Sequence, residues 1–154
     1  MSGVEVVLTP GECRLAAYTG VNRRLDAMAK GRFEVYGKAA NGAYWEIDLE
    51  AAAAELALAK ALGVHWCGMD RPDKDTGDVA GAQVRHTKRD DGSLICHKRD
   101  ADEDRFVLVT GSMPTFTVRG WILGAEAKAD RFWRTSVPRP AYFVPQSALA
   151  PITS

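Results

Sequence analysis

The sequence predicts an α+β domain in which N-terminal helices pack on a mainly antiparallel, mixed central sheet. Helical periodicity is concentrated in residues 10–62 and strand patterns follow in residues 83–123, an order of elements that is typical of the α+β class. The chain has 154 residues, of which 46% are hydrophobic, and this is enough to form one hydrophobic core without disulfides or metal ions. Neither an internal repeat nor a linker divides the sequence, so residues 1–154 are expected to form one domain.

The first expected elements are a short strand, Val4 to Leu8, and a helix that ends near Lys30. Thr9 is suited to cap this helix because Glu12 stands three residues later and completes a capping box. One apolar stripe with helical spacing is expected to face the core, and it consists of Leu15, Tyr18, Val21, Leu25 and Met28.

A second helix is expected from about Leu49 to Leu62, with Asp48 as its N-cap and Gly63 as its end. The helix is dense in alanine, and small side chains allow a helix to approach a neighbouring element closely. Glu55 is expected to face the sheet and not solvent, because it shares one helical face with Ala51, Leu58 and Leu62.

A series of strands is expected after a long polar loop that runs from Gly68 to Gly81. Residues 83–88 and 93–98 are expected to pair as a hairpin, since the Asp90-Asp91-Gly92 segment between them is a turn signal. Phe106 to Thr110 lacks polar alternation, which predicts a central strand covered on both faces. The remaining expected elements are a strand at 116–123, a short helix from 124 and an edge strand at 141–144.

Charge and cysteine content exclude several classes of protein. Twenty basic and twenty acidic residues cancel, which excludes a chain that is basic throughout and coats DNA, and equally an acidic DNA mimic. Three cysteines are an odd and sparse set, which argues against a secreted disulfide scaffold. The N-terminus lacks the pattern of a signal peptide, and no apolar run approaches the length of a membrane span. We therefore expect a cytoplasmic protein without membrane contact.

Two acids, an amide and a guanidinium are expected to meet at one end of the sheet. Glu55 needs a partner, because a carboxylate on an apolar helix face is costly to bury. Asp78 ends the polar loop, and Gln83 and Arg85 lie on one face of the strand that follows. The alternative is purely structural: Glu55 borders the helix surface, Asp78 caps a turn and Arg85 is an exposed strand residue.

Several stretches from Ile47 onward, which together cover most of the chain, carry a resemblance to known proteins. They are Ile47-Asp48-Leu49-Glu50, Ala54-Glu55-Leu56-Ala57, Val84-Arg85-His86-Thr87, Leu94-Ile95, Asp100 through Val109, Gly120 through Lys128 and Phe143 through Leu149. On these stretches, the run from Ile47 to the C-terminus resembles a family of small uncharacterised tailed-phage proteins. The layout of helix, strand series, helix and strand also looks like the PD-(D/E)XK nuclease-like fold. Residues 44–154 would form that core, with residues 1–32 as an N-terminal strand and helix extension.

The resemblance implies a catalytic site. In that superfamily an Asp precedes a strand bearing (Glu/Gln)-x-Lys, and a helical Glu often lies nearby. The matching residues here are Asp78, Gln83, Arg85 and Glu55, and the resemblance implies Mg²⁺ bound by Asp78, Glu55 and the carbonyl of Val84, with no organic cofactor. Two positions depart from the pattern. Gln83 offers a neutral oxygen where many members have a carboxylate, and Arg85 keeps its proton, so it can orient a phosphate but cannot act as a base.

The expected function is that of a phage-encoded nuclease-like protein in the host cytoplasm, which hydrolyses phosphodiesters with a metal or binds nucleic acid. Basic residues of the C-terminal third would contact phosphates, namely Arg119, Lys128, Arg131 and Arg134. The alternative is a non-catalytic interaction protein on a degenerate nuclease-like fold, either a virion accessory component or an inhibitor of a host enzyme. Convergence of Glu55, Asp78 and Gln83 would favour the enzyme, whereas a structural ion pair at Arg85 would favour the alternative.

Overall fold

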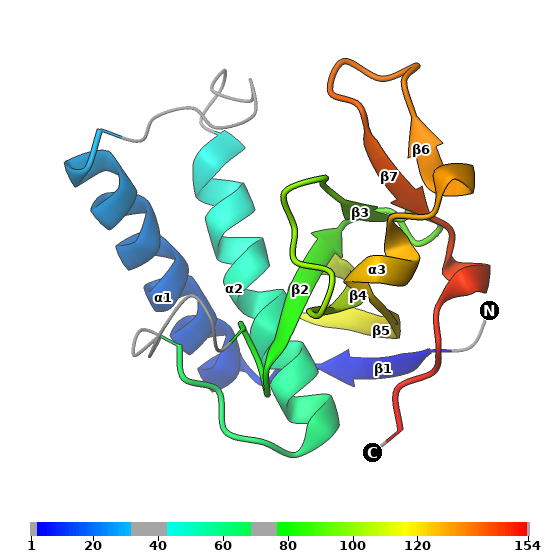
Figure 1. Ribbon diagram of the computed structural model, residues 1–154. Coiled ribbons are helices and arrows are strands. Elements are labelled where there is room, and N and C mark those ends of the chain that lie inside the picture. The colour runs from blue at the N-terminus through cyan, green and yellow to red at the C-terminus, as the bar shows by residue number, and fades with distance from the viewer. Residues whose placement is uncertain (1–2, 32–42, 69–76, 154) are drawn as a thin grey trace.

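The computed structural model describes residues 3–31, 43–68 and 77–153. Its elements in chain order are β1 (Val4–Val7), α1 (Pro10–Ala29), α2 (Ala43–Leu62), β2 (Ala82–Thr87), β3 (Leu94–Cys96), β4 (Arg105–Ser112), β5 (Thr115–Leu123), α3 (Gly124–Ala127), the 3-10 helix η3 (Asp130–Phe132), β6 (Trp133–Arg134), β7 (Ala141–Val144) and the 3-10 helix η4 (Gln146–Ala148). Helix α2 packs on a four-stranded sheet, α1 packs on the outer side of α2, and a smaller sheet lies away from both helices (Figure 1). The expected α+β class is thus confirmed.

The larger sheet has the strand order β1-β5-β4-β2. Strand β2 runs parallel to β4, whereas the β4–β5 and β1–β5 pairs are antiparallel, so the sheet is mixed as expected. Phe106 to Thr110 of β4 are five consecutive buried residues between two neighbouring strands. The prediction of a central strand covered on both faces is therefore confirmed.

The expected hairpin of residues 83–88 with residues 93–98 is wrong. Strand β2 belongs to the larger sheet, whereas β3 pairs with β7 in the smaller sheet, whose order is β3-β7-β6. The reason is that Leu94 and Cys96 are completely buried in a second hydrophobic cluster with Phe106 and Val144, which a β2–β3 hairpin would not provide. The segment 141–144 is accordingly the middle strand of the smaller sheet and not an edge.

Helix α1 begins as the sequence predicts but presents the opposite face to the protein. The Thr9 hydroxyl accepts the N–H of Glu12, and the Glu12 carboxylate accepts the N–H of Thr9, which completes the capping box. The expected buried stripe, however, faces solvent: the exposed fractions are 51% for Leu15, 64% for Tyr18 and 48% for Leu25.

Small residues explain why α1 turns this way. Its buried positions include Ala16, Thr19 and Gly20, and several residues of α2 are equally small and buried, Ala52 and Ala53 among them. A Cβ atom at Gly20 would lie only 2.7 Å from the Cα of Leu49, so the two helix backbones are nearly in contact. Large apolar side chains do not fit beside Gly20, and they are left on the outer side of α1, although the longer Arg24 is buried next to Asp48.

Helix α2 includes six residues that were expected to precede it. Asp48 therefore lies within the helix and is not its N-cap, and its carboxylate is 3.6 Å from the guanidinium of the buried Arg24. Burial raises the pKa of Asp48, although the nearby positive charges of Arg24 and Arg23 oppose the shift. Gly63 follows the helix with a φ of 67°, which fits its expected role as the end.

The core consists of two hydrophobic clusters. The first lies between α2 and the larger sheet and includes Ala57, Leu58, Val109 and Phe116. The second lies between the two sheets. In the described ranges no helix combines the length and the apolar character that crossing a bilayer requires.

Candidate functional site

Glu55 is buried as expected, with 4% of its surface exposed, but its carboxylate is held by α1 and Trp66, whereas we expected it to face the sheet. Its two carboxylate oxygens accept hydrogen bonds from the guanidinium of Arg23 at 3.0 and 2.9 Å. The indole N–H of Trp66 donates a third bond to Glu55 Oε2 at 3.2 Å, and Arg23 also donates to the carbonyl of Gly68 at 3.0 Å. Glu55 thus ties α2 to α1 and to the segment that follows α2.

Asp78 organises the turn that leads into β2. Its Oδ2 accepts the backbone N–H of Val84 at 2.8 Å, and its own N–H donates to the carbonyl of Ala82 at 2.7 Å. This is the geometry of the structural alternative, in which Asp78 caps a turn. Gln83, which is half-buried, stands beside Phe106 of β4 in the parallel register. Most of the expected loop, residues 69–76, lies outside the described residues.

Arg85 forms an ion pair that connects the two sheets. Its Nη2 is 2.9 Å from Oδ2 of Asp100, and its Nε donates to the carbonyl of Ile95 in β3 at 3.1 Å. The guanidinium lies over the ring of Phe106, with 4.9 Å to the ring centre. Asp100 also accepts the backbone N–H of His97 at 2.7 Å. Arg85 therefore holds the end of β3 against β2.

These contacts shift the pKa of Asp100. Burial raises its pKa, but the His97 N–H and the Arg85 guanidinium outweigh burial, and the pKa of Asp100 lies below its usual value of 3.8. A carboxylate with a depressed pKa adds stability above its usual pKa and loses that contribution as the pH falls.

Asp100→Asn is therefore expected to lower the free energy of unfolding by about 1 kcal/mol at neutral pH. The difference from wild type should shrink as the pH falls below 3.8, the ordinary pKa of the side chain. Urea titrations at several pH values measure this. A difference that stays constant down to strongly acidic pH would show that the charge of Asp100 has no part in the effect.

The residues expected to bind Mg²⁺ thus have protein partners in different places: Arg23 and Trp66 for Glu55, and the Val84 N–H for Asp78. Among the described residues, no group of three or more His, Cys, Asp or Glu side chains is placed to hold a metal ion. Arg85 shows the structural ion pair that we expected of a non-catalytic protein. The magnesium site stays a prediction.

The four basic residues expected to bind phosphates fall into two groups. Arg119 and Lys128 have side chains that are only 13% and 17% exposed, and they contact Thr110 and Asp102 respectively. Arg131 and Arg134 are exposed, and Arg134 donates to the carbonyl of Arg131 at 3.3 Å. Arg119 and Lys128 therefore make structural contacts, whereas Arg131 and Arg134 are accessible to a ligand.

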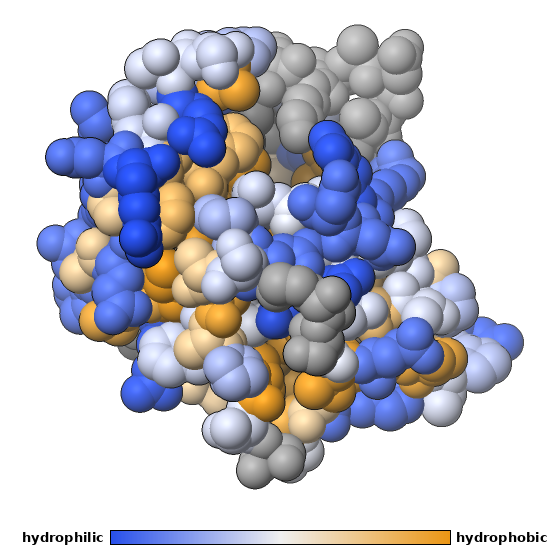
Figure 2. Space-filling view, turned by 90° about the vertical axis from the view of Figure 1, so that its right-hand side faces the viewer, coloured by the Kyte–Doolittle hydropathy of each residue, from blue (hydrophilic) through white to orange (hydrophobic). Residues whose placement is uncertain are grey.

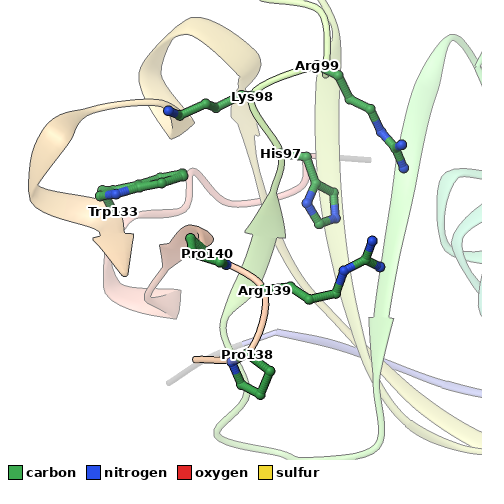
Figure 3. Close-up of a pocket in the computed structure, with 7 residues that line it drawn as sticks. All are labelled: His97, Lys98, Arg99, Trp133, Pro138, Arg139 and Pro140. Atoms are coloured by element: carbon green, nitrogen blue, oxygen red, sulfur yellow. The ribbon is translucent and has the colours of Figure 1, made fainter. Parts of the chain in front are cut away.

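A basic pocket of about 430 Å³ lies where β3 ends and the chain turns into β7. Figure 3 shows two groups of side chains in it: His97, Arg99 and Arg139 point to one side, and Lys98 lies over Trp133 on the other. Seen from the right of Figure 1, much of the surface is hydrophilic, with hydrophobic side chains exposed in between (Figure 2). The pocket is lined by His97, Lys98, Arg99, Trp133, Pro138, Arg139 and Pro140.

Positive charge gathers around His97. Burial lowers the pKa of His97, the carboxylate of Asp100 raises it, and the guanidiniums of Arg85, Arg99 and Arg139 lower it further. His97, Arg99 and Arg139 each take part in an interaction with another residue. Lys98, Arg99 and Arg139 thus give the pocket positive charge beside the His97 imidazole.

Only some of the basic residues of this pocket can be recognised as a group in the sequence. His97, Lys98 and Arg99 are consecutive basic residues directly after a strand, a run that can be read from the sequence. Arg139, between Pro138 and Pro140, is 40 residues further along the chain, and only the pairing of β3 with β7 brings it close. Lys98 places its ammonium 4.6 Å from the ring centre of Trp133, which also packs against Tyr142.

Comparison of the chain with protein-family models, with curated proteins and with solved structures finds no match.

Proposed function

We propose that this protein binds nucleic acid at the basic pocket without cleaving it. The observation that carries the proposal is the group of basic side chains that line the pocket, His97, Lys98, Arg99 and Arg139. Guanidiniums bind phosphate oxygens through paired hydrogen bonds, and a concave basic site concentrates their field on the ligand. Arg131 and Arg134, exposed just before and within β6, extend the basic surface along the chain.

Phosphate contact is favoured over base stacking as the main binding mode. Base stacking needs an open aromatic face, whereas Trp133 is engaged by Lys98 and by Tyr142. Phosphate binding needs hydrogen-bond donors and positive charge, which Lys98, Arg99 and Arg139 supply in the pocket. Binding is therefore expected to depend steeply on salt and weakly on sequence.

The absence of cleavage in this proposal rests on what Glu55, Asp78 and Arg85 already do. Mg²⁺ at Glu55 would have to replace a bidentate bond to Arg23, and Mg²⁺ at Asp78 would compete with the N–H of Val84. Both carboxylates support the fold in their present positions. Chelating divalent metal is therefore expected to leave nucleic-acid binding unchanged.

Arg139→Gln is expected to weaken binding of a single-stranded oligonucleotide about tenfold at low salt, because one charge-assisted phosphate contact is lost. Fluorescence polarisation with a labelled oligonucleotide measures this, and the slope of affinity against salt should fall by about one phosphate contact. Arg14→Gln is the matched control, since Arg14 is exposed on α1, a helix that lies on the side of the molecule away from β6 and β7 (Figure 1). Equal binding by both variants, or metal-dependent cleavage by wild type, would contradict the proposal.

A further inference from the structure

We infer that two copies of this chain associate through the outer face of α1, with the two helices antiparallel. The face is formed by Leu15, Tyr18, Asn22 and Leu25, with Val21 and Met28 beside them. In Figure 1 α1 is the outermost element on its side of the molecule. This surface is independent of the basic pocket, which lies at the other end.

The exposure of this face is unusual for a helix that is half apolar. Leu15, Tyr18, Leu25 and Met28 are exposed by 51%, 64%, 48% and 40%. Together they present roughly 400 Å² of mainly apolar surface, if a fully exposed large side chain contributes about 200 Å². A contiguous apolar patch of this size on a monomer typically marks an interaction site.

The spacing of the face suits a helix as its partner. Leu15, Tyr18, Asn22 and Leu25 follow one another at intervals of three, four and three residues, which is the seam of a two-helix coiled coil. When two such helices pack antiparallel around a two-fold axis, Leu15 of one copy meets Leu25 of the other, and Tyr18 meets Asn22. The face is thus complementary to itself, leucine against leucine and a phenol against an amide.

Charge and area determine how strongly a second copy binds to this surface. The chain carries no net charge at pH 7, so two copies do not repel each other. Two copies of the patch bury roughly 800 Å² in total, which lies below the 1,200 Å² or more of stable complexes and in the range of weak ones. The dimer is therefore reversible and forms as protein concentration rises.

Sedimentation velocity over a range of protein concentrations tests this inference with two charged variants of the full chain. Leu15→Arg and Leu25→Glu are each expected to remain monomeric under conditions in which wild type dimerises. A dimer of either variant would contain the substitution twice, and each new charge would lie against a leucine of the other copy. Their equimolar mixture is expected to dimerise again. In the antiparallel pair one contact then becomes Arg against Glu, and the other stays Leu against Leu. Both substitutions are on the exposed face, and circular dichroism verifies that the variants are folded.

Three results would overturn the inference. A wild type that stays monomeric at high concentration would show that the face does not join two copies. Single variants that dimerise like wild type would place the interface elsewhere. A mixture that stays monomeric would exclude the antiparallel pairing, because parallel helices would set residue 15 against residue 15.

Discussion

Glu55→Ala is expected to lower the free energy of unfolding by about 3 kcal/mol, because it breaks a buried ion pair on one side only. Glu55 is 4% exposed and accepts both hydrogen bonds of the Arg23 fork as well as the indole N–H of Trp66. Without the carboxylate, the Arg23 charge and the Trp66 donor remain in a largely dry interface. Alanine also leaves a cavity between α1 and α2, which adds to the loss.

Urea unfolding of a double-mutant cycle measures the contribution of the pair. Arg23→Ala is expected to be destabilising as well, and the double variant should cost at least 1 kcal/mol less than the sum of the single variants. Lys88→Ala is the control, since it removes an ion pair with Glu46 whose side chains are 50% and 59% exposed. An exposed pair of this kind contributes at most about 1 kcal/mol.

The same measurement separates a structural role of Glu55 from a metal-binding one. Carboxylates gathered to hold Mg²⁺ repel one another when the metal is absent, so removing one of them commonly stabilises the metal-free protein. Removing a carboxylate that neutralises Arg23 has the opposite effect, because it lowers the stability of the protein. If Glu55→Ala raised the stability of metal-free protein, the structural role described here would be wrong and the predicted magnesium site would gain support.

Elements with a local physical cause could be predicted from the sequence. The capping box of Thr9 and Glu12 fixes the start of α1, and the uninterrupted apolar run of β4 requires cover on both faces. The burial of Glu55 also followed from its apolar helical neighbours. In each case the residues that decide the structure lie within one helix turn or one strand.

Features that depend on distant partners could not be predicted in the same way. Periodicity identified the apolar stripe of α1 but not its orientation, because the narrow contact of Gly20 is with the backbone of a second helix, at Asp48 and Leu49. Likewise, the turn signal at residues 90–92 could not show that β3 prefers β7.

The candidate site also depends on partners that are distant in the sequence. The order Asp78, Gln83, Arg85 correctly predicted that Asp78 precedes β2 and that Gln83 and Arg85 lie within it. Their partners are set by tertiary structure, however: Asp100 for Arg85 is 15 residues away in sequence, and Arg23 for Glu55 is 32 residues away. The basic pocket needs Arg139 beside His97, which only the smaller sheet provides.

The close contact between α1 and α2 at Gly20 is the basis of a second prediction with a large effect on stability. Gly20→Ala is expected to lower the free energy of unfolding by about 2 kcal/mol, although alanine is normally better than glycine inside a helix by about 1 kcal/mol. A Cβ at this position would lie 2.7 Å from the Cα of Leu49 and 2.8 Å from the carbonyl oxygen of Asp48. Both are backbone atoms, so no side chain can rotate away and the helices must separate.

Gly11→Ala provides a matched comparison within the same helix, because the nearest atom to a Cβ there is the hydroxyl of Thr9 at 4.0 Å. This variant is expected to keep or slightly raise the stability of wild type, since the methyl group meets open space and restricts the unfolded chain. Urea unfolding of the two variants therefore separates the cost of the contact from the general preference for alanine. Separation of α1 from α2 should also lengthen the Arg23–Glu55 bonds, so Gly20→Ala combined with Glu55→Ala should cost less than the two changes added together. Equal stability of Gly20→Ala and Gly11→Ala would show that α1 and α2 do not depend on a backbone contact at Gly20.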